Sequence, residues 1–118
     1  MFTLHSDDIF CLYRKSTDMR KSFDGLCGIV ESELKRTAIS GEVFIFINRR
    51  RDRIKLLKWQ KGGFELYYKR LEQGTFELPP EPLEGVSSPV VWSDLVMMIE
   101  GIPLVEKQKK RRRFNVIK

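Results

Sequence analysis

Residues 43–78, VFIFINRRRDRIKLLKWQKGGFELYYKRLEQGTFEL, decide the fold of this chain. Apolar runs of strand length alternate here with short polar segments that favour turns. The run from Val43 to Ile47 is apolar at every position, which predicts a central strand covered on both faces. Turns are predicted at residues 48–52 and at residues 60–63, where two glycines adjoin. The stretch is therefore interpreted as a twisted β-meander.

The first strand after the basic turn, predicted over residues 53–59, alternates charged and apolar residues. Ile54 and Leu56 share one face, and Arg53 and Lys55 lie on the other. This alternation indicates a positively charged face beside a buried one.

The next strand is predicted over residues 64–71, with Tyr68 on its apolar face and Tyr67 among charged residues on the opposite face. A further short strand is predicted over residues 75–78. The prolines at 79–80 end the ladder, because proline has no N–H to donate.

Two elements are predicted before the meander. Residues 9–13 form an apolar and aromatic run, which indicates a strand buried on both faces. From Met19 to Arg36, apolar residues recur at spacings of three and four, which predicts an amphipathic helix of about four turns. Gly25 and Gly28 lie inside this helix, where close packing against the sheet is expected to offset their low helix propensity. Candidate N-caps are Ser16, Thr17 and Asp18.

After the meander, residues 79–89 are rich in proline, glutamate and serine and are interpreted as an irregular loop. A shorter helix is predicted to begin near Trp92, with Ser93 or Asp94 as its cap and Gly101 at its end.

The predicted fold class is α+β. A small mixed or antiparallel β-sheet, made of a short N-terminal strand and a three- to four-strand meander, packs against one long amphipathic helix. A short C-terminal helix and a basic tail follow. The 118 residues, of which 42% are hydrophobic, fit one domain over residues 1–104. Residues 105–118 form the tail, whose run KQKKRRR repels itself and is expected to be disordered when unbound.

Cysteine usage and hydropathy indicate a cytoplasmic protein. Cys11 and Cys27 lie in apolar patterns without CxxC spacing, and the chain has one histidine, His5. Buried reduced thiols are therefore favoured over a disulfide or a metal pair. No apolar run reaches the roughly 20 residues that span a membrane, and no basic and apolar leader opens the sequence.

The sequence carries no catalytic signature. A phosphate-binding loop, a dinucleotide-binding glycine turn and a nucleophile elbow are all missing. We therefore expect a non-enzyme with no cofactor, no metal and no small-molecule substrate. A small metal-dependent nuclease is a remote alternative that requires carboxylates to converge. The candidates for that site are Asp7, Asp8, Asp18, Asp24, Asp52 and Asp94.

Positive charge is concentrated in two segments. Between Arg49 and Arg70, nine Lys or Arg stand against two acids, and residues 107–118 carry a further +7, whereas the whole chain has +6. Such clustering indicates a polyanionic partner, with nucleic acid favoured. A solvated basic face and docking on an acidic protein surface are the alternatives.

The predicted DNA contacts come from basic side chains of the meander, with two aromatic side chains stacking or packing among them. Arg20 and Lys21, at the predicted start of the long helix, either receive a phosphate at the helix end or are neutralised by Asp18. The candidate nucleic-acid-binding residues are Arg20, Lys21, Arg49, Arg50, Arg51, Arg53, Lys55, Trp59, Tyr67, Lys69 and Arg70. A secondary basic site is predicted in the tail at Lys107, Lys109, Lys110, Arg111, Arg112 and Arg113.

Three ordered motifs resemble a known family. They are DMRKSFDGL at 18–26, VFIFINRRRDRIKLL at 43–57, and GF at 63–64 followed by YKRLE at 68–72. They look like the accessory protein TnpB of the insertion-sequence-sixty-six transposase family, over about residues 1–103. The chain departs from that family at Ser22, where glycine is frequent, and at Leu78, where tryptophan is common.

The resemblance implies an accessory protein of a bacterial mobile element, encoded beside a large transposase that performs the strand chemistry. It implies DNA, especially element ends, the cognate transposase and other element-encoded proteins as partners. It supplies no catalytic residue. DNA binding that assists assembly of the transposase complex is the leading hypothesis, and an adaptor that binds the transposase without touching DNA is the alternative.

Overall fold

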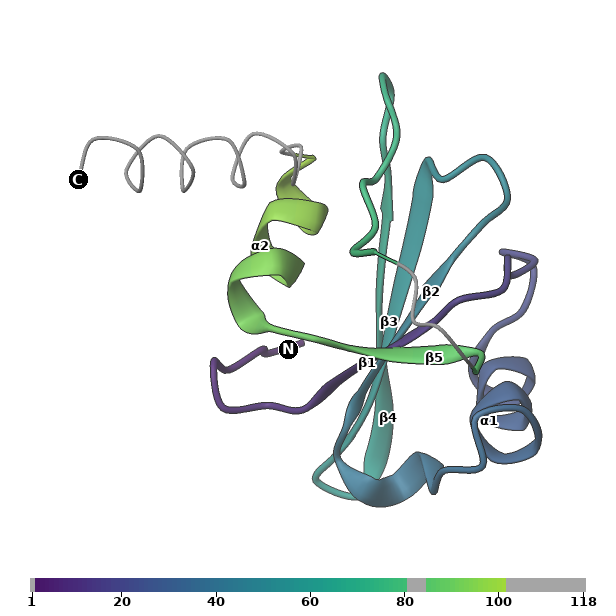
Figure 1. The fold of residues 1–118 in the computed structure, drawn as a ribbon. Helices are drawn as coiled ribbons and strands as arrows, with labels where there is room; N and C mark the ends of the chain where they lie inside the picture. The colour runs from purple at the N-terminus through teal and green to yellow at the C-terminus, as the bar shows by residue number, and fades with distance from the viewer. Residues whose placement is uncertain (1, 81–84, 102–118) are drawn as a thin grey trace.

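The computed structural model describes residues 2–80 and 85–101, which form an α+β fold around a five-stranded mixed sheet. The sheet order is β4-β3-β2-β1-β5, and the helices α1 and α2 lie on opposite sides of it (Figure 1). The elements are β1 Phe10–Tyr13, α1 Phe23–Ser32, the 3-10 turn η1 Ala38–Ser40, β2 Val43–Ile47, β3 Arg53–Gln60, β4 Gly63–Arg70, β5 Ser87–Val90 and α2 Trp92–Glu100.

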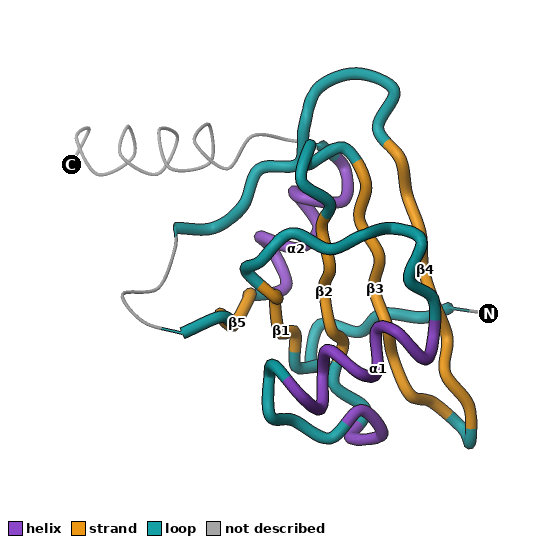
Figure 2. Tube along the Cα trace, turned by 90° about the vertical axis from the view of Figure 1, so that its right-hand side faces the viewer, coloured by secondary structure: helices purple, strands orange, loops and turns teal. Residues whose placement is uncertain are grey.

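The sheet is mixed because β1 and β2 run parallel, while the other neighbouring strands are antiparallel. A parallel pair needs a long crossover connection, and α1 with η1 supplies it. The strands β2, β3 and β4 form the predicted meander, and Figure 2 shows them side by side with α1 lying across one face.

The central strand prediction is confirmed, because every residue of β2 is buried. Alternate side chains of β2 enter two different cores. Phe44 and Phe46 pack with Leu26 and Val30 of α1. On the other face, residues of β1, β2 and β3 pack with Leu95 and other residues of α2. β1 is likewise buried at all of its positions, as its apolar run predicted.

The long helix predicted from Met19 to Arg36 is shorter in the structure. α1 has 10 residues and begins at Phe23. The carbonyl oxygens of Met19 and Lys21 accept hydrogen bonds from the buried Lys55 Nζ, at 2.8 and 2.7 Å. These contacts fix the preceding residues in a non-helical turn, and Ser22 becomes the N-cap without a side-chain bond. The predicted caps at residues 16–18 are therefore wrong.

The reason predicted for the helix glycines is also wrong. A Cβ added at Gly28 would meet nothing within 4 Å. A Cβ at Gly25 would lie 3.1 Å from the Lys21 side chain rather than against the sheet. Gly25 therefore makes room for the stem of Lys21, and Gly28 has no packing role among the described residues.

Two predictions around the fifth strand need correction. Residues 75–78 are not a strand: the Phe76 N–H donates to the Arg51 carbonyl at 2.6 Å, and its ring is buried. The segment predicted as a loop over residues 79–89 instead contains most of β5, which pairs antiparallel with β1. Pro89 lies opposite Cys11 in this pair, and proline is tolerated there because β5 is an edge strand.

The predicted C-terminal helix is confirmed as α2, with Leu95 and Met98 buried and Gly101 ending it at a φ of 74°. Its N-cap is Val91 rather than Ser93 or Asp94. Cys11 and Cys27 are free cysteines. No helix in the described part of the chain is both long enough and apolar enough to cross a membrane. The tail predicted over 105–118 lies outside the described residues.

Candidate nucleic-acid interface

The segment Asn48–Arg53, called here the arginine turn, is held together by one amide side chain. Asn48 Oδ1 accepts hydrogen bonds from the backbone N–H groups of Asp52 and Arg53, at 3.1 and 3.0 Å. Asn48 Nδ2 donates to Asp52 Oδ1 at 2.7 Å, and this bond is the main reason that the pKa of Asp52 lies below its usual value. The amide therefore closes the turn from inside.

Neighbouring backbone segments fix the arginine turn from outside. The Leu71 N–H donates to the Asp52 carbonyl at 2.7 Å, and the Phe76 N–H donates to the Arg51 carbonyl at 2.6 Å. Arg51 itself has a φ of 60°, a left-handed conformation that a side chain makes costly. The backbone of the turn is thus built as a rigid base for its side chains.

The side chains of the turn are open to solvent. Arg49, Arg50 and Arg51 are exposed, and Arg53 is half-buried. None of the four guanidinium groups has a hydrogen-bond or ion-pair partner within residues 2–80 and 85–101. Positive charge that is not consumed internally is available to an anion.

A second loop, Thr17–Lys21, lies beside the arginine turn and is joined to it through the Thr17 N–H, which donates to the Ile47 carbonyl at 2.9 Å. Its Asp18 accepts from the Arg20 guanidinium at 3.0 and 2.6 Å and from the Arg20 N–H at 2.9 Å. The guanidinium bonds chiefly lower the pKa of Asp18 to about 2.

These contacts correct the predicted helix-end phosphate site. α1 begins at Phe23, so Arg20 and Lys21 precede the helix rather than occupying its first turn. The Arg20 N–H is already bonded to Asp18 and is not free for a phosphate. Lys21 is exposed, with no ion pair to its side chain in the described part of the chain.

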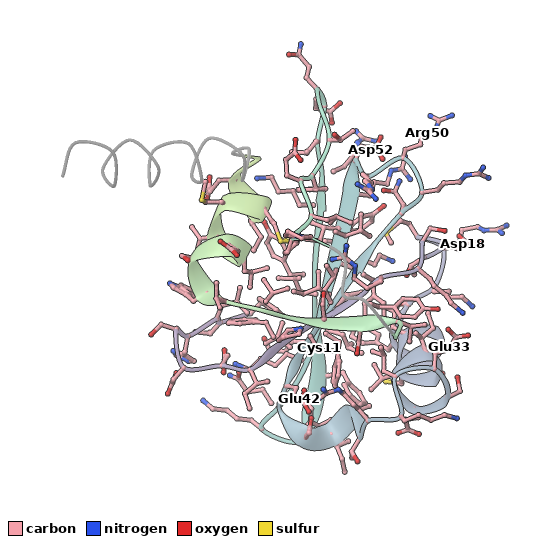
Figure 3. All side chains as sticks on the ribbon, viewed as in Figure 1. Cys11, Asp18, Glu33, Glu42, Arg50 and Asp52 are labelled. Carbon is pink, nitrogen blue, oxygen red and sulfur yellow. The ribbon has the colours of Figure 1, made fainter. Side chains whose placement is uncertain are left out.

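The loop and the arginine turn line an open cleft of about 460 Å³. In Figure 3, Arg50 and Asp18 are seen on the same side of the molecule, remote from α2. Four guanidinium groups and two carboxylates border this cleft, so residues far apart in sequence meet at one electropositive site. We call this cleft the arginine cleft. It is lined by Thr17, Asp18, Met19, Arg20, Asn48, Arg49, Arg50, Asp52 and Arg53.

The predicted solvent position of Lys55 is wrong, because its side chain is only 5% exposed. Its Nζ donates to two carbonyls of the Thr17–Lys21 loop and lies 4.7 Å from the centre of the Tyr68 ring. Burial is the main reason that its pKa lies below the usual value. Lys55 therefore holds the loop to the sheet and is not open to a nucleic acid.

Lys69 is similarly occupied, since its Nζ donates at 2.6 Å to the Ile99 carbonyl near the end of α2. The two aromatic candidates pack internally. The Tyr67 ring lies 5.8 Å from Phe2, and Trp59 meets Phe64 edge to face at 4.8 Å. These three side chains therefore make contacts within the fold.

Arg70 ends β4 directly opposite Arg53, and its guanidinium pairs with Glu72 at 2.9 Å. Tyr68, two pairs along and on the same face, is 48% exposed. Sequence reasoning missed Tyr68 because it placed this residue on a buried face. The local pattern gave no signal for its exposure, because it predicted a longer helix than α1, which has 10 residues.

The nuclease alternative requires several carboxylates to converge on one point. Within the described ranges 2–80 and 85–101, no group of three or more His, Cys, Asp or Glu is close enough to hold an ion. Asp18 and Asp52, two of the carboxylates considered for a nuclease, are engaged by Arg20 and Asn48. The basic tail candidates at 107–113 lie outside the described residues.

Comparison with known proteins gives one family. The family model described as IS66 Orf2 like protein matches residues 8–109. Two proteins of Sinorhizobium fredii (strain NBRC 101917 / NGR234), both described as uncharacterized, are similar. The protein y4jC is 33% identical over 95 residues, covering 80% of this chain and 81% of its own length. The protein y4hO is 33% identical over 101 residues, covering 85% of each chain. No solved structure matches the chain significantly.

Proposed function

The chain belongs to the family of IS66 Orf2 like proteins, which indicates an accessory role in transposition, and we propose that it performs this role by binding DNA. The arginine cleft and the rest of the arginine turn contact phosphates, at or near element ends. The protein assists assembly of the transposase complex in the cytoplasm and does not catalyse strand chemistry.

One observation carries this proposal: arginines from two separate loops line one cleft. The guanidinium groups of the arginine turn have no ion-pair partner among the described residues, whereas Arg20 pairs with Asp18. Clustering like charges costs free energy unless an anion binds there. Guanidinium groups present planar pairs of donors that match phosphate oxygens. Phosphate contacts give affinity without sequence information, so the transposase supplies most of the choice of DNA site in this proposal.

The test is binding to duplex DNA with element-end and unrelated sequences across a salt series, with and without the transposase. With around five phosphate contacts, log affinity falls with log salt at a slope of about −4 to −5. Similar affinity for both sequences is expected in the absence of the transposase. Undetectable binding to either duplex at low salt would contradict the proposal.

A second function, an adaptor that binds the transposase without DNA, is favoured by a different surface. Ile9 and Val91 are 65% and 60% exposed, and they flank the paired residues Phe10 and Val90 of β1 and β5. Adjacent exposed apolar side chains suit a protein partner. In this case the protein co-purifies with the transposase in the presence of nuclease, and Val91→Glu abolishes co-purification while the charge-matched Thr37→Glu does not.

A further inference from the structure

Four residues on the α1 side of the sheet form a block that α1 does not cover. Arg53 of β3 lies opposite Arg70 of β4, and Lys55 lies opposite Tyr68. Residues directly opposite on one face of an antiparallel pair are in contact distance, about 5 Å between Cβ atoms. The block therefore places one exposed aromatic ring over a buried ammonium, and the next pair on the same face is Arg53 and Arg70.

Lys55 fixes the ring of Tyr68 in place. Its Nζ lies 4.7 Å from the ring centre and is itself tied to the carbonyls of Met19 and Lys21. Met19 lines the arginine cleft. The inner face of the Tyr68 ring is thus connected through one buried cation to the wall of the cleft, and the ring is a preformed platform beside it.

The outer side of Tyr68 is accessible. The side chain is 48% exposed, whereas Tyr67 and Trp59 are half-buried against Phe2 and Phe64. A hollow of about 340 Å³ adjoins it, bordered by Arg70 and Glu72. An aromatic face next to a hollow leaves room for a flat group.

The two arginines beside the ring are poised to exchange partners. Like charges directly opposite each other on a sheet disfavour the pair. Arg70 is balanced by Glu72, but both side chains are mostly exposed, so the ion pair is weak and a phosphate competes with it readily. Phosphate-binding groups therefore stand on both sides of the platform, in the cleft and in the hollow.

We infer that this surface binds single-stranded DNA, with an unpaired base stacked on Tyr68 and flanking phosphates held by Arg53, Arg70 and the arginine cleft. Aromatic platforms in a basic groove suit single strands, whose bases present free faces. In a duplex the base faces are covered by neighbouring pairs, so the ring adds nothing. This inference rests on the proposed DNA-binding function and specifies the form of DNA.

The experiment compares an oligothymidine with a duplex of the same length by fluorescence anisotropy at fixed low salt. The variants are Tyr68→Ala and Tyr68→Leu, with Tyr68→Phe as the matched control that keeps the ring. Tyr68→Leu keeps apolar cover over Lys55, and circular dichroism establishes that each variant is folded.

The expected result is tighter binding of the single strand than of the duplex. Tyr68→Ala and Tyr68→Leu weaken single-strand affinity about tenfold, since one stacked base is lost, and Tyr68→Phe retains it. Duplex affinity is unchanged in all three. Equal or tighter duplex binding, or single-strand affinity insensitive to Tyr68→Leu, overturns this inference and leaves the proposed function standing. Absence of binding to both forms overturns both.

Discussion

The strands β3 and β4 and the arginine turn that joins β2 to β3 share one run of basic sequence, but their cations have different partners. In the strands, the ammonium groups of Lys55, Lys58 and Lys69 each donate to backbone carbonyls of other segments, and Lys58 also pairs with Asp8 at 2.9 Å. In the turn, the arginines Arg49 and Arg50 point to solvent without such partners in the described part of the chain.

The difference teaches that a count of positive charges overstates the surface available to a polyanion. A lysine ammonium is compact and its three donors can meet oxygens from several directions, which suits a buried cross-link. A guanidinium is planar and suits phosphate. The internal cations of the two strands are therefore lysines, whereas the open cations of the arginine turn carry guanidinium groups.

The largest effect that tests this comparison is on stability. Lys55→Met removes the ammonium and leaves the carbonyls of Met19 and Lys21 without their donor. We expect a loss of about 3 kcal/mol in the free energy of unfolding, because each buried unsatisfied polar group costs about 1–3 kcal/mol. Urea denaturation measures it. Arg50→Gln is the control, expected within about 0.5 kcal/mol of the wild type; equal effects in the two variants would erase the distinction.

Asn48→Ala tests whether the turn is built by its amide. The change orphans the N–H groups of Asp52 and Arg53 and is expected to cost about 2 kcal/mol. DNA affinity should also fall although no charge is lost, because the arginines lose their common base. Asn48→Asp is the control for the acceptor role: it keeps an oxygen for both N–H groups but repels Asp52. Fluorescence anisotropy measures the affinity for DNA. If Asn48→Ala binds DNA as tightly as the wild type, DNA binding does not need a fixed turn geometry.

Arg51→Gly tests the conformational cost of an arginine with positive φ. Glycine adopts a φ of 60° without strain, so we expect the variant to be about 1 kcal/mol more stable by thermal or urea denaturation. Arg51→Ala removes the same charge and keeps the strain, and its stability should stay near that of the wild type. Equal stabilisation in both variants would indicate relief of charge repulsion instead.

The smallest effect concerns the Asp18–Arg20 pair. The pKa of Asp18 is lowered from an ordinary 3.8 to about 2 by the guanidinium. A lowered pKa in the folded state gives a stabilising contribution that is present above 3.8 and is lost as the pH falls through about 2. Carboxyl NMR titration should show this value, and Arg20→Gln should return it toward 3.8. A pKa unchanged by Arg20→Gln would mean that the pair does not form in solution.

The parts of the fold predictable from sequence are those with strong periodicity. The apolar run of β2, the glycine turn between β3 and β4, and α2 with its terminal Gly101 all follow from local pattern. β5 did not, because its sequence Ser87–Val90 has a proline and little apolar character. Its pairing depends on β1, a contact that only the tertiary fold supplies.

The sequence predicted where the candidate site lies but not all of the residues that line it. Clustered arginines predicted the turn, and the structure brings Arg20 to it through the Thr17–Ile47 backbone bond. Lys55 was wrongly predicted to contact DNA, because strand alternation predicts which face of the sheet a side chain occupies but not which segment covers that face. The non-helical loop before α1 supplies the two carbonyls that accept hydrogen bonds from the buried lysine. Local sequence patterns do not reveal such long-range contacts.

The most direct test of the central claim is the salt dependence of duplex binding in two doubly substituted proteins with the same net charge. Arg49→Gln/Arg50→Gln removes two open arginines of the cleft, and Lys35→Gln/Lys61→Gln removes two exposed lysines that do not line it. The account predicts that the first pair flattens the slope of log affinity against log salt by about 2, since each phosphate contact contributes about 0.9, and that the second leaves it unchanged. Equal flattening by both pairs would contradict it, because binding would then follow net charge rather than the arginine cleft.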